Sequence, residues 1–90
     1  MDNYQTTVVL RQYPDGEVIA LMPDDVDPRD GTVTCYLHVG QHGAADYSHV
    51  IAATRVANML APEVIALRDE LVAIGYNAKY RQRRDRRNRL

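Results

Sequence analysis

The pattern of apolar and polar positions in the first forty residues predicts three β-strands. Residues 6–13 and 17–22 are apolar runs rich in strand formers, and the Pro-Asp-Gly sequence at 14–16 between them is typical of a tight turn. These two runs are expected to form a β-hairpin. Residues 32–39 alternate strictly, which predicts a third strand. Its core-facing side is expected to carry Val33, Cys35, Leu37 and Val39, and its other side Thr34, Tyr36 and His38.

A helical period follows between residues 62 and 74. Apolar residues recur there at spacings of three and four: Val64, Leu67, Leu71 and Ile74. Pro62 suits the first turn of a helix, where its missing N–H would be unpaired anyway. Gly75 is expected to end the helix by taking a left-handed conformation. Residues 76–81 then fit a final strand that returns to the sheet.

Two segments have less regular patterns. Residues 23–31 hold four aspartates, two prolines and a glycine, and we expect a solvated loop, since the acids lack the alternate spacing of a calcium loop. Residues 47–57 fit either a fourth strand that pairs back on the third or the start of a helix. We favour the strand, because the glycine-rich connection before it suits a hairpin.

These elements predict an α+β fold in the order ββββαβ, with an antiparallel β-sheet of four to five strands and one α-helix packed on one face. Ninety residues are enough for one domain, which we place at residues 1–81. Residues 82–90 are expected to form a basic C-terminal tail. Because a core of this size is modest, a homo-oligomer is a reasonable expectation.

The net charge of −1 conceals a strong asymmetry. Residues 79–90 hold seven basic residues against one acid, whereas residues 1–78 hold four against eleven. The tail arginines are candidates for an electrostatic arm: Arg83, Arg84, Arg86, Arg87 and Arg89. They could contact nucleic-acid phosphates, pair with carboxylates of an acidic partner or of the 24–30 loop of a neighbouring subunit, or remain solvated.

The sequence also bears on the compartment. Its single cysteine, Cys35, cannot form an internal disulfide, which favours a reducing, cytoplasmic setting. The first residues lack the basic and apolar regions of a signal peptide, and no apolar run reaches the roughly 18 residues of a membrane span. We therefore expect a soluble protein.

All three histidines lie in residues 38–49, together with two of the five glycines. The candidate binding residues in this segment are His38, Gly40, Gln41, His42, Gly43, Asp46, Tyr47 and His49. Such a concentration of hydrogen-bonding groups and permissive backbone is typical of a binding loop. The alternative is an ordinary hairpin loop, in which Asp46 accepts backbone hydrogen bonds and Tyr47 covers the sheet edge.

Catalytic and metal chemistry fit this segment poorly. The spacing of His38 and His42 would align their rings on a helix, which the glycines disfavour. Ser48 and His49 are adjacent, and adjacent strand residues point to opposite faces, as Cys35 and His38 also would. We therefore expect no catalytic residue, no metal and no cofactor.

A phosphorylated or nucleotide ligand is a second possibility for the same segment. Backbone N–H groups beside the glycines can approach an anion closely, and the histidines supply further donors. Tyr36 or Tyr47 could then stack on a base.

The run YLHVGQHGAADY at 36–47 resembles a segment of small uncharacterised proteins from phage, prophage and other mobile elements. Residues 7–11, 15–21 and 74–76 resemble the same family in the same order, whereas residues 58–61 and the arginine tail depart from it. The resemblance covers most of residues 6–81 and implies a mobile-element origin. Small proteins of that origin are often stoichiometric inhibitors.

These observations together predict a small non-enzymatic binding protein that inhibits a host defence or regulatory complex in the host cytoplasm. Residues 38–49 would be its recognition surface. The alternatives are capture of a small phosphorylated or nucleotide ligand and an enzyme that uses a histidine-bound metal.

Overall fold

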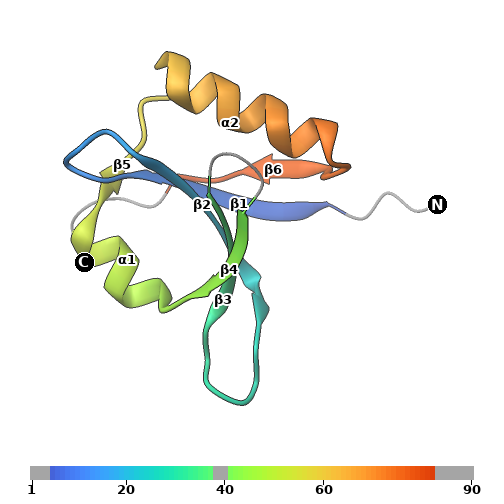
Figure 1. The fold of residues 1–90 in the computed structure, drawn as a ribbon. Coiled ribbons are helices and arrows are strands. Elements are labelled where there is room, and N and C mark those ends of the chain that lie inside the picture. The colour runs from blue at the N-terminus through green and yellow to red at the C-terminus, as the bar shows by residue number, and fades with distance from the viewer. Residues whose placement is uncertain (1–4, 38–40, 83–90) are drawn as a thin grey trace.

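The structure, a computed structural model, describes residues 5–37 and 41–82. The elements in chain order are β1 (Thr6–Gln12), β2 (Val18–Val26), β3 (Val33–Leu37), β4 (Gln41–Ala45), α1 (Tyr47–Ala53), β5 (Arg55–Val56), α2 (Pro62–Ala73) and β6 (Ala78–Tyr80) (Figure 1). The predicted α+β class is confirmed, with a largely antiparallel sheet and one main helix packed on it.

The strands lie in the order β4-β3-β2-β1-β5, and β6 also pairs with β1. The predicted hairpin of β1 and β2 is present, and Gly16 in its turn has a φ of 98°, which a side chain would disfavour. On the other side of β1, β5 pairs antiparallel with the end of the strand. β6 returns to the sheet as predicted, but it runs parallel to β1, with Thr6 opposite Ala78.

Both faces of the sheet carry an apolar core, which corrects the expectation of one helix on one face. The core under α2 is formed by Val8, Leu10, Val18, Ala20, Met22, Tyr36, Ala57, Val64, Leu67 and Leu71. The core under α1 is formed by Val9, Ile19, Leu21, Val33, Cys35 and Val50. Figure 1 shows the two helices on opposite sides of the sheet. The side of β3 predicted to lie away from the core is therefore also covered, and Tyr36 is 2% exposed.

The prediction of a loop from residue 23 is wrong for its first part, because β2 continues to Val26. The pairing of β2 with β3 shifts between Met22 and Val26, where an irregularity accommodates Pro23 without a ladder N–H. The turn proper begins at Asp27, whose carboxylate forms an ion pair with Arg29 at 2.9 Å.

Residues 47–57 do not form the favoured fourth strand. Tyr47–Ala53 is the helix α1, and β5 covers Arg55–Val56. The hairpin that the glycines suggested is made by β3 with β4, so the second strand lies within the segment predicted to be a loop. Asp46 then caps the helix.

The predicted helix at 62–74 is confirmed as α2, and Gly75 after it has a φ of 106°. Its apolar stripe ends at Leu71, since Ile74 is 50% exposed. In the part of the chain that the structure describes, no helix is long and apolar enough to cross a membrane.

Candidate functional site

The candidate residues at 38–49 are divided between two elements. Gln41, His42 and Gly43 lie on β4, whereas Asp46 is the N-cap of α1 and the helix itself carries Tyr47 and His49. His38, Gly40 and the five tail arginines Arg83, Arg84, Arg86, Arg87 and Arg89 lie outside the described residues. The described part of the segment is therefore an edge strand followed by a capped helix.

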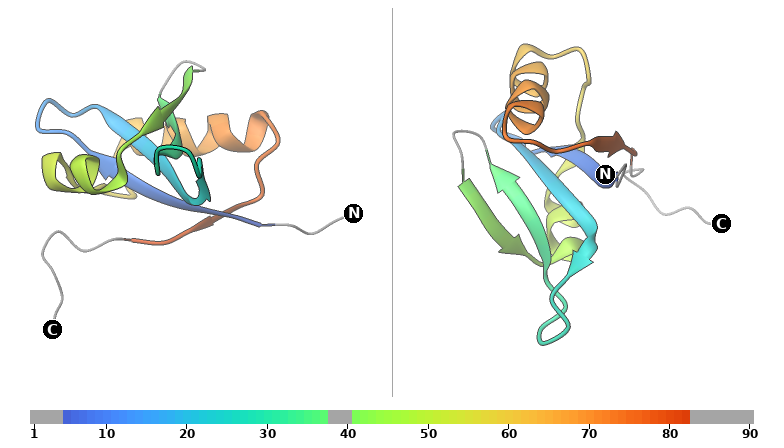
Figure 2. Two further views of the ribbon diagram at one scale, coloured as in Figure 1. Left: turned by 90° about the horizontal axis from the view of Figure 1, so that it is seen from below. Right: turned by 90° about the vertical axis from the view of Figure 1, so that its right-hand side faces the viewer.

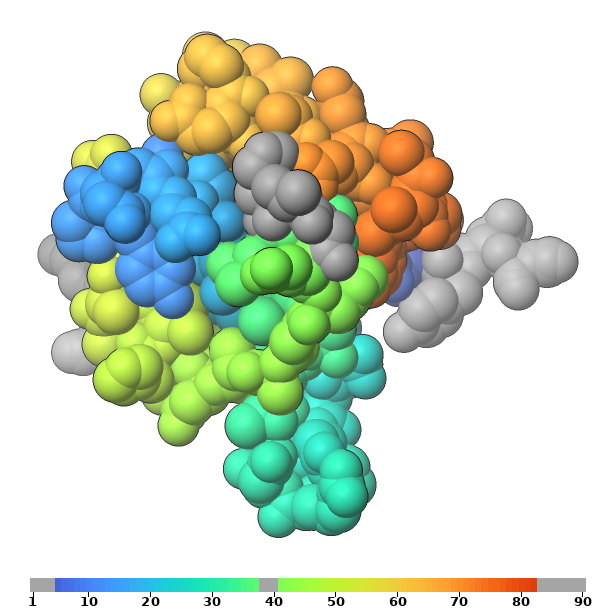
Figure 3. Space-filling view, in the orientation of Figure 1, coloured from blue at the N-terminus to red at the C-terminus, as the bar shows by residue number. Residues whose placement is uncertain are grey.

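β4 lies at the edge of the sheet. It pairs with β3 along its whole length, from Leu37 opposite Gln41 to Val33 opposite Ala45. Figure 2 shows it as the outermost strand on this side, and Figure 3 shows the same segment, in green, at the molecular surface. The strand contains no charged residue and no proline, which are the usual protections of an exposed edge.

The hydrogen-bonding direction of the sheet is set at the turn between β1 and β2. There the Tyr13 N–H donates to the Glu17 carbonyl at 2.8 Å. Because this direction alternates along an antiparallel strand, Leu10 must face away from β2. Its carbonyl indeed accepts from the Ala57 N–H, on the β5 side, at 3.3 Å.

The same alternation, followed through the paired residues, shows which peptide groups of β4 are open. Ala20 faces β3 and lies opposite Tyr36, so the next residue of β3 faces β4 and lies opposite Gly43. Gly43 is therefore bonded inward. Its neighbours His42 and Ala44 direct their N–H and C=O groups outward from the sheet.

The side chain of His42 is held on the α2 side of the sheet. Its ring packs edge-on against Tyr36, with 4.9 Å between ring centroids. Its Nε2 lies 2.8 Å from the hydroxyl of Tyr76. The Tyr36 hydroxyl in turn donates to Glu70 Oε1 of α2 at 2.8 Å. Burial raises the pKa of Tyr76, so this hydroxyl remains protonated at neutral pH. An exposed imidazole is thereby fixed beside the open edge.

These positions limit the other chemistry considered for the segment. Tyr36 is buried and Tyr47 packs against the α1 core, so stacking on a nucleotide base would require either ring to leave its core. His49 lies on α1, across the sheet from the His42 ring. Burial raises the pKa of the Cys35 thiol, which disfavours the reactive thiolate. Among the described residues, no group of three histidine, cysteine or acidic side chains could hold a metal ion.

Asp46 fulfils the structural role considered for it, because its Oδ1 accepts the His49 N–H at 3.1 Å. We expect Asp46→Ala to destabilise the fold by about 1 kcal/mol, the usual cost of losing an N-cap. Asp46→Asn keeps an acceptor oxygen and should cost much less. Urea denaturation of both variants checks this, and equal losses would show that the cap oxygen is not responsible.

Comparisons of this chain with protein-family models, with curated proteins and with solved structures found no match. The resemblance to mobile-element proteins therefore stays a prediction.

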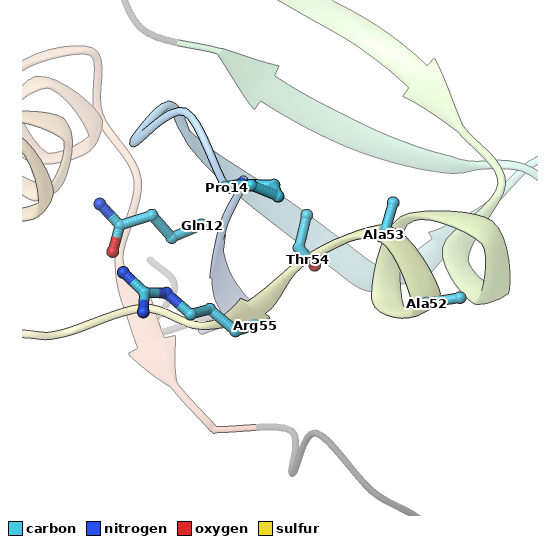
Figure 4. A pocket seen from close by; sticks show the side chains of 6 residues that line it. All are labelled: Gln12, Pro14, Ala52, Ala53, Thr54 and Arg55. Carbon is cyan, nitrogen blue, oxygen red and sulfur yellow. The ribbon is translucent and has the colours of Figure 1, made fainter.

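Sequence reasoning missed one buried polar group, Arg11, which is 0% exposed under α1. Beside it, a hollow of about 430 Å³ is lined by Gln12, Pro14, Ala52, Ala53, Thr54 and Arg55 (Figure 4). The Gln12 amide already donates to the Gly16 carbonyl at 3.0 Å, and Arg55 is exposed. The signal for Arg11 in the sequence was a charged residue within an apolar strand.

Proposed function

We propose that this chain is a small non-catalytic binding protein that captures a partner protein by pairing an extended segment of the partner with the edge of β4. The observation that carries the proposal is the open, uncharged and proline-free edge at Gln41–Ala45. In such strand addition, main-chain hydrogen bonds supply affinity and neighbouring side chains supply specificity.

The edge is suited to this role in two ways. The outward peptide groups of His42 and Ala44 offer two donors and two acceptors to an incoming strand. Glycine and alanine fill the rest of β4 apart from Gln41, so few side chains obstruct the approach. His42, held by Tyr36 and Tyr76, is the polar side chain that would distinguish one partner segment from another.

The partner class follows from the resemblance to mobile-element proteins, and the proposal takes it from there. A protein of that origin would act by occupying a surface of a host defence or regulatory complex. The arginines after residue 82 would add a salt-sensitive attraction to an acidic partner.

The test is Ala44→Pro, which removes an outward N–H while leaving the bonds between β4 and β3 in place. Ala44→Val is the matched control, because it keeps the N–H. We expect host proteins retained by the wild type and by Ala44→Val to bind Ala44→Pro at least about tenfold more weakly, as the loss of one or two backbone hydrogen bonds at an interface implies. The melting temperature should change by less than about 4 °C.

The measurement is affinity capture from host lysate, followed by titration of each retained protein against the three variants. Unchanged binding of the retained proteins to a folded Ala44→Pro variant would refute the strand-addition proposal. Failure of the wild type to retain any protein would count against a host-protein partner.

A further inference from the structure

The outer flank of α2 carries a second unpartnered surface. Ile65, Arg68, Asp69 and Val72 are spaced i, i+3, i+4 and i+7, so they form one stripe along the helix. With Tyr80 of β6 they line a groove of about 390 Å³. Ile65 is 43% exposed and Val72 67% exposed. In Figure 1 no other described element lies over this side of α2.

α2 is thus apolar on two sides. Val64, Leu67 and Leu71 face the core, whereas Ile65 and Val72 face solvent. A helix that faces water on one side normally carries polar residues there. Exposed apolar residues that flank charged ones on a single stripe are typical of a contact surface.

The stripe is complementary to itself. If a second α2 is laid antiparallel about a two-fold axis midway between Arg68 and Asp69, Ile65 of one copy meets Val72 of the other. The same operation places Arg68 opposite Asp69 of the other copy, twice. A two-fold interface requires one surface to complement itself in this way. We propose that the α2 flank is the interface of a homodimer, with a second copy of this chain as its partner.

The central charges are positioned for this contact before association. The Arg68 guanidinium lies 5.0 Å from the centroid of the Tyr80 ring, so the side chain is already ordered. Asp69 is exposed beside it and has no printed constraint on its reach toward an arginine across the axis.

The dimer does not use the β4 edge. The groove lies between α2 and β6, and β6 pairs with β1, whereas β4 ends the opposite side of the sheet. A dimer through α2 would therefore carry two open β4 edges and could bind two partner segments at once. It rests on different residues from the proposed function, so either can fail without the other.

Two charge reversals test the proposal. Arg68→Asp places acids opposite acids in its own dimer, and Asp69→Arg places arginines opposite arginines. In a mixed dimer of the two variants, both central contacts are again between opposite charges. We expect each variant alone to dimerise at least about tenfold more weakly than the wild type, and an equimolar mixture to recover the wild-type affinity.

Sedimentation of the full chain from about 10 µM to about 1 mM is the measurement, since a contact of this size is weak. Glu17→Arg has the same net charge as Asp69→Arg but lies at the start of β2, away from the stripe. Mixed with Arg68→Asp, it should not restore dimerisation, which separates a specific contact from general attraction.

Recovery in the mixture also shows that neither reversal has unfolded the chain. A wild type that stays monomeric at the highest concentration overturns the proposal. So do single variants that dimerise as well as the wild type, or a mixture of folded variants that remains monomeric.

Discussion

Replacing Arg11 with methionine is expected to destabilise the fold by about 3 kcal/mol, the cost of removing a charged donor from buried acceptors. The guanidinium is fully buried beneath the end of α1. Its Nε donates to Thr54 Oγ1 at 2.9 Å, and its Nη2 donates to the Ile51 carbonyl at 3.1 Å and the Thr54 carbonyl at 2.7 Å. Methionine fills a similar space but leaves these oxygens without the donors.

The arginine also acts on the helix itself. Carbonyls at a helix C-terminus lack partners within the helix and carry partial negative charge, so a cation there is favourable. Arg11→Lys keeps the charge but cannot reach several acceptors from a planar fork, and we expect about half the loss. Denaturant unfolding of both variants measures these differences.

Arg55→Met is the matched control, because Arg55 is an exposed arginine on the neighbouring strand. We expect its free energy of unfolding to change by less than about 0.5 kcal/mol. Comparable losses at the two positions would contradict the role assigned to Arg11, since burial would then make no difference.

Arg11 also shows why sequence reasoning stops where it does. A charged residue in an apolar strand was visible, but its partner Thr54 lies 43 residues further along the chain. By contrast, the β1–β2 hairpin and α2 were predictable. Their signals are local: a Pro-Asp-Gly turn in the first case, and a three-four apolar period between Pro62 and Gly75 in the second.

α1 was missed because its local signals compete. Tyr47, Val50 and Ile51 include good strand formers, yet they are spaced three and four apart and follow Asp46, a strong N-cap. β4 had already formed the hairpin, so no second strand was needed. That pairing depends on β3, and it was invisible in a segment composed of small side chains and a histidine.

The form of the candidate site was missed for the same reason. The sequence predicted that the polar segment from His38 to His49 is exposed and rich in donors. It did not predict that backbone groups, rather than the three imidazoles, would be the open functionality. Which peptide groups remain free follows from the register of the whole sheet, starting at Tyr13 and Glu17.

Leu67→Ala is expected to cost about 3 kcal/mol, within the range for truncating a fully buried leucine. Leu67 is 0% exposed and contributes to the core between α2 and the sheet. In a domain of this size such a loss lowers the melting temperature by roughly 15 °C. It is a large effect, because domains of this kind are stable by only about 5–15 kcal/mol.

Leu60→Ala is the matched control, since the same atoms are removed from a side chain that is 83% exposed. Its melting temperature should differ from the wild type by less than about 4 °C. Thermal unfolding at about 10 µM, followed by far-ultraviolet circular dichroism, keeps association through α2 from obscuring the comparison, since a contact of that size is weak. A loss of less than about 1 kcal/mol at Leu67 would show that the α2 layer packs loosely on the sheet.

The same experiment tests how the two layers are coupled. Both cores share β1, β2 and β3, so removing packing under α2 should also release α1. Tyrosine signals distinguish the two sides, because Tyr36 packs under α2 whereas Tyr47 packs under α1. We expect both signals and the backbone signal to change in one transition for the wild type and for Leu67→Ala. Two separated transitions would instead mean that the sheet with α1 and its β4 edge can stand without α2.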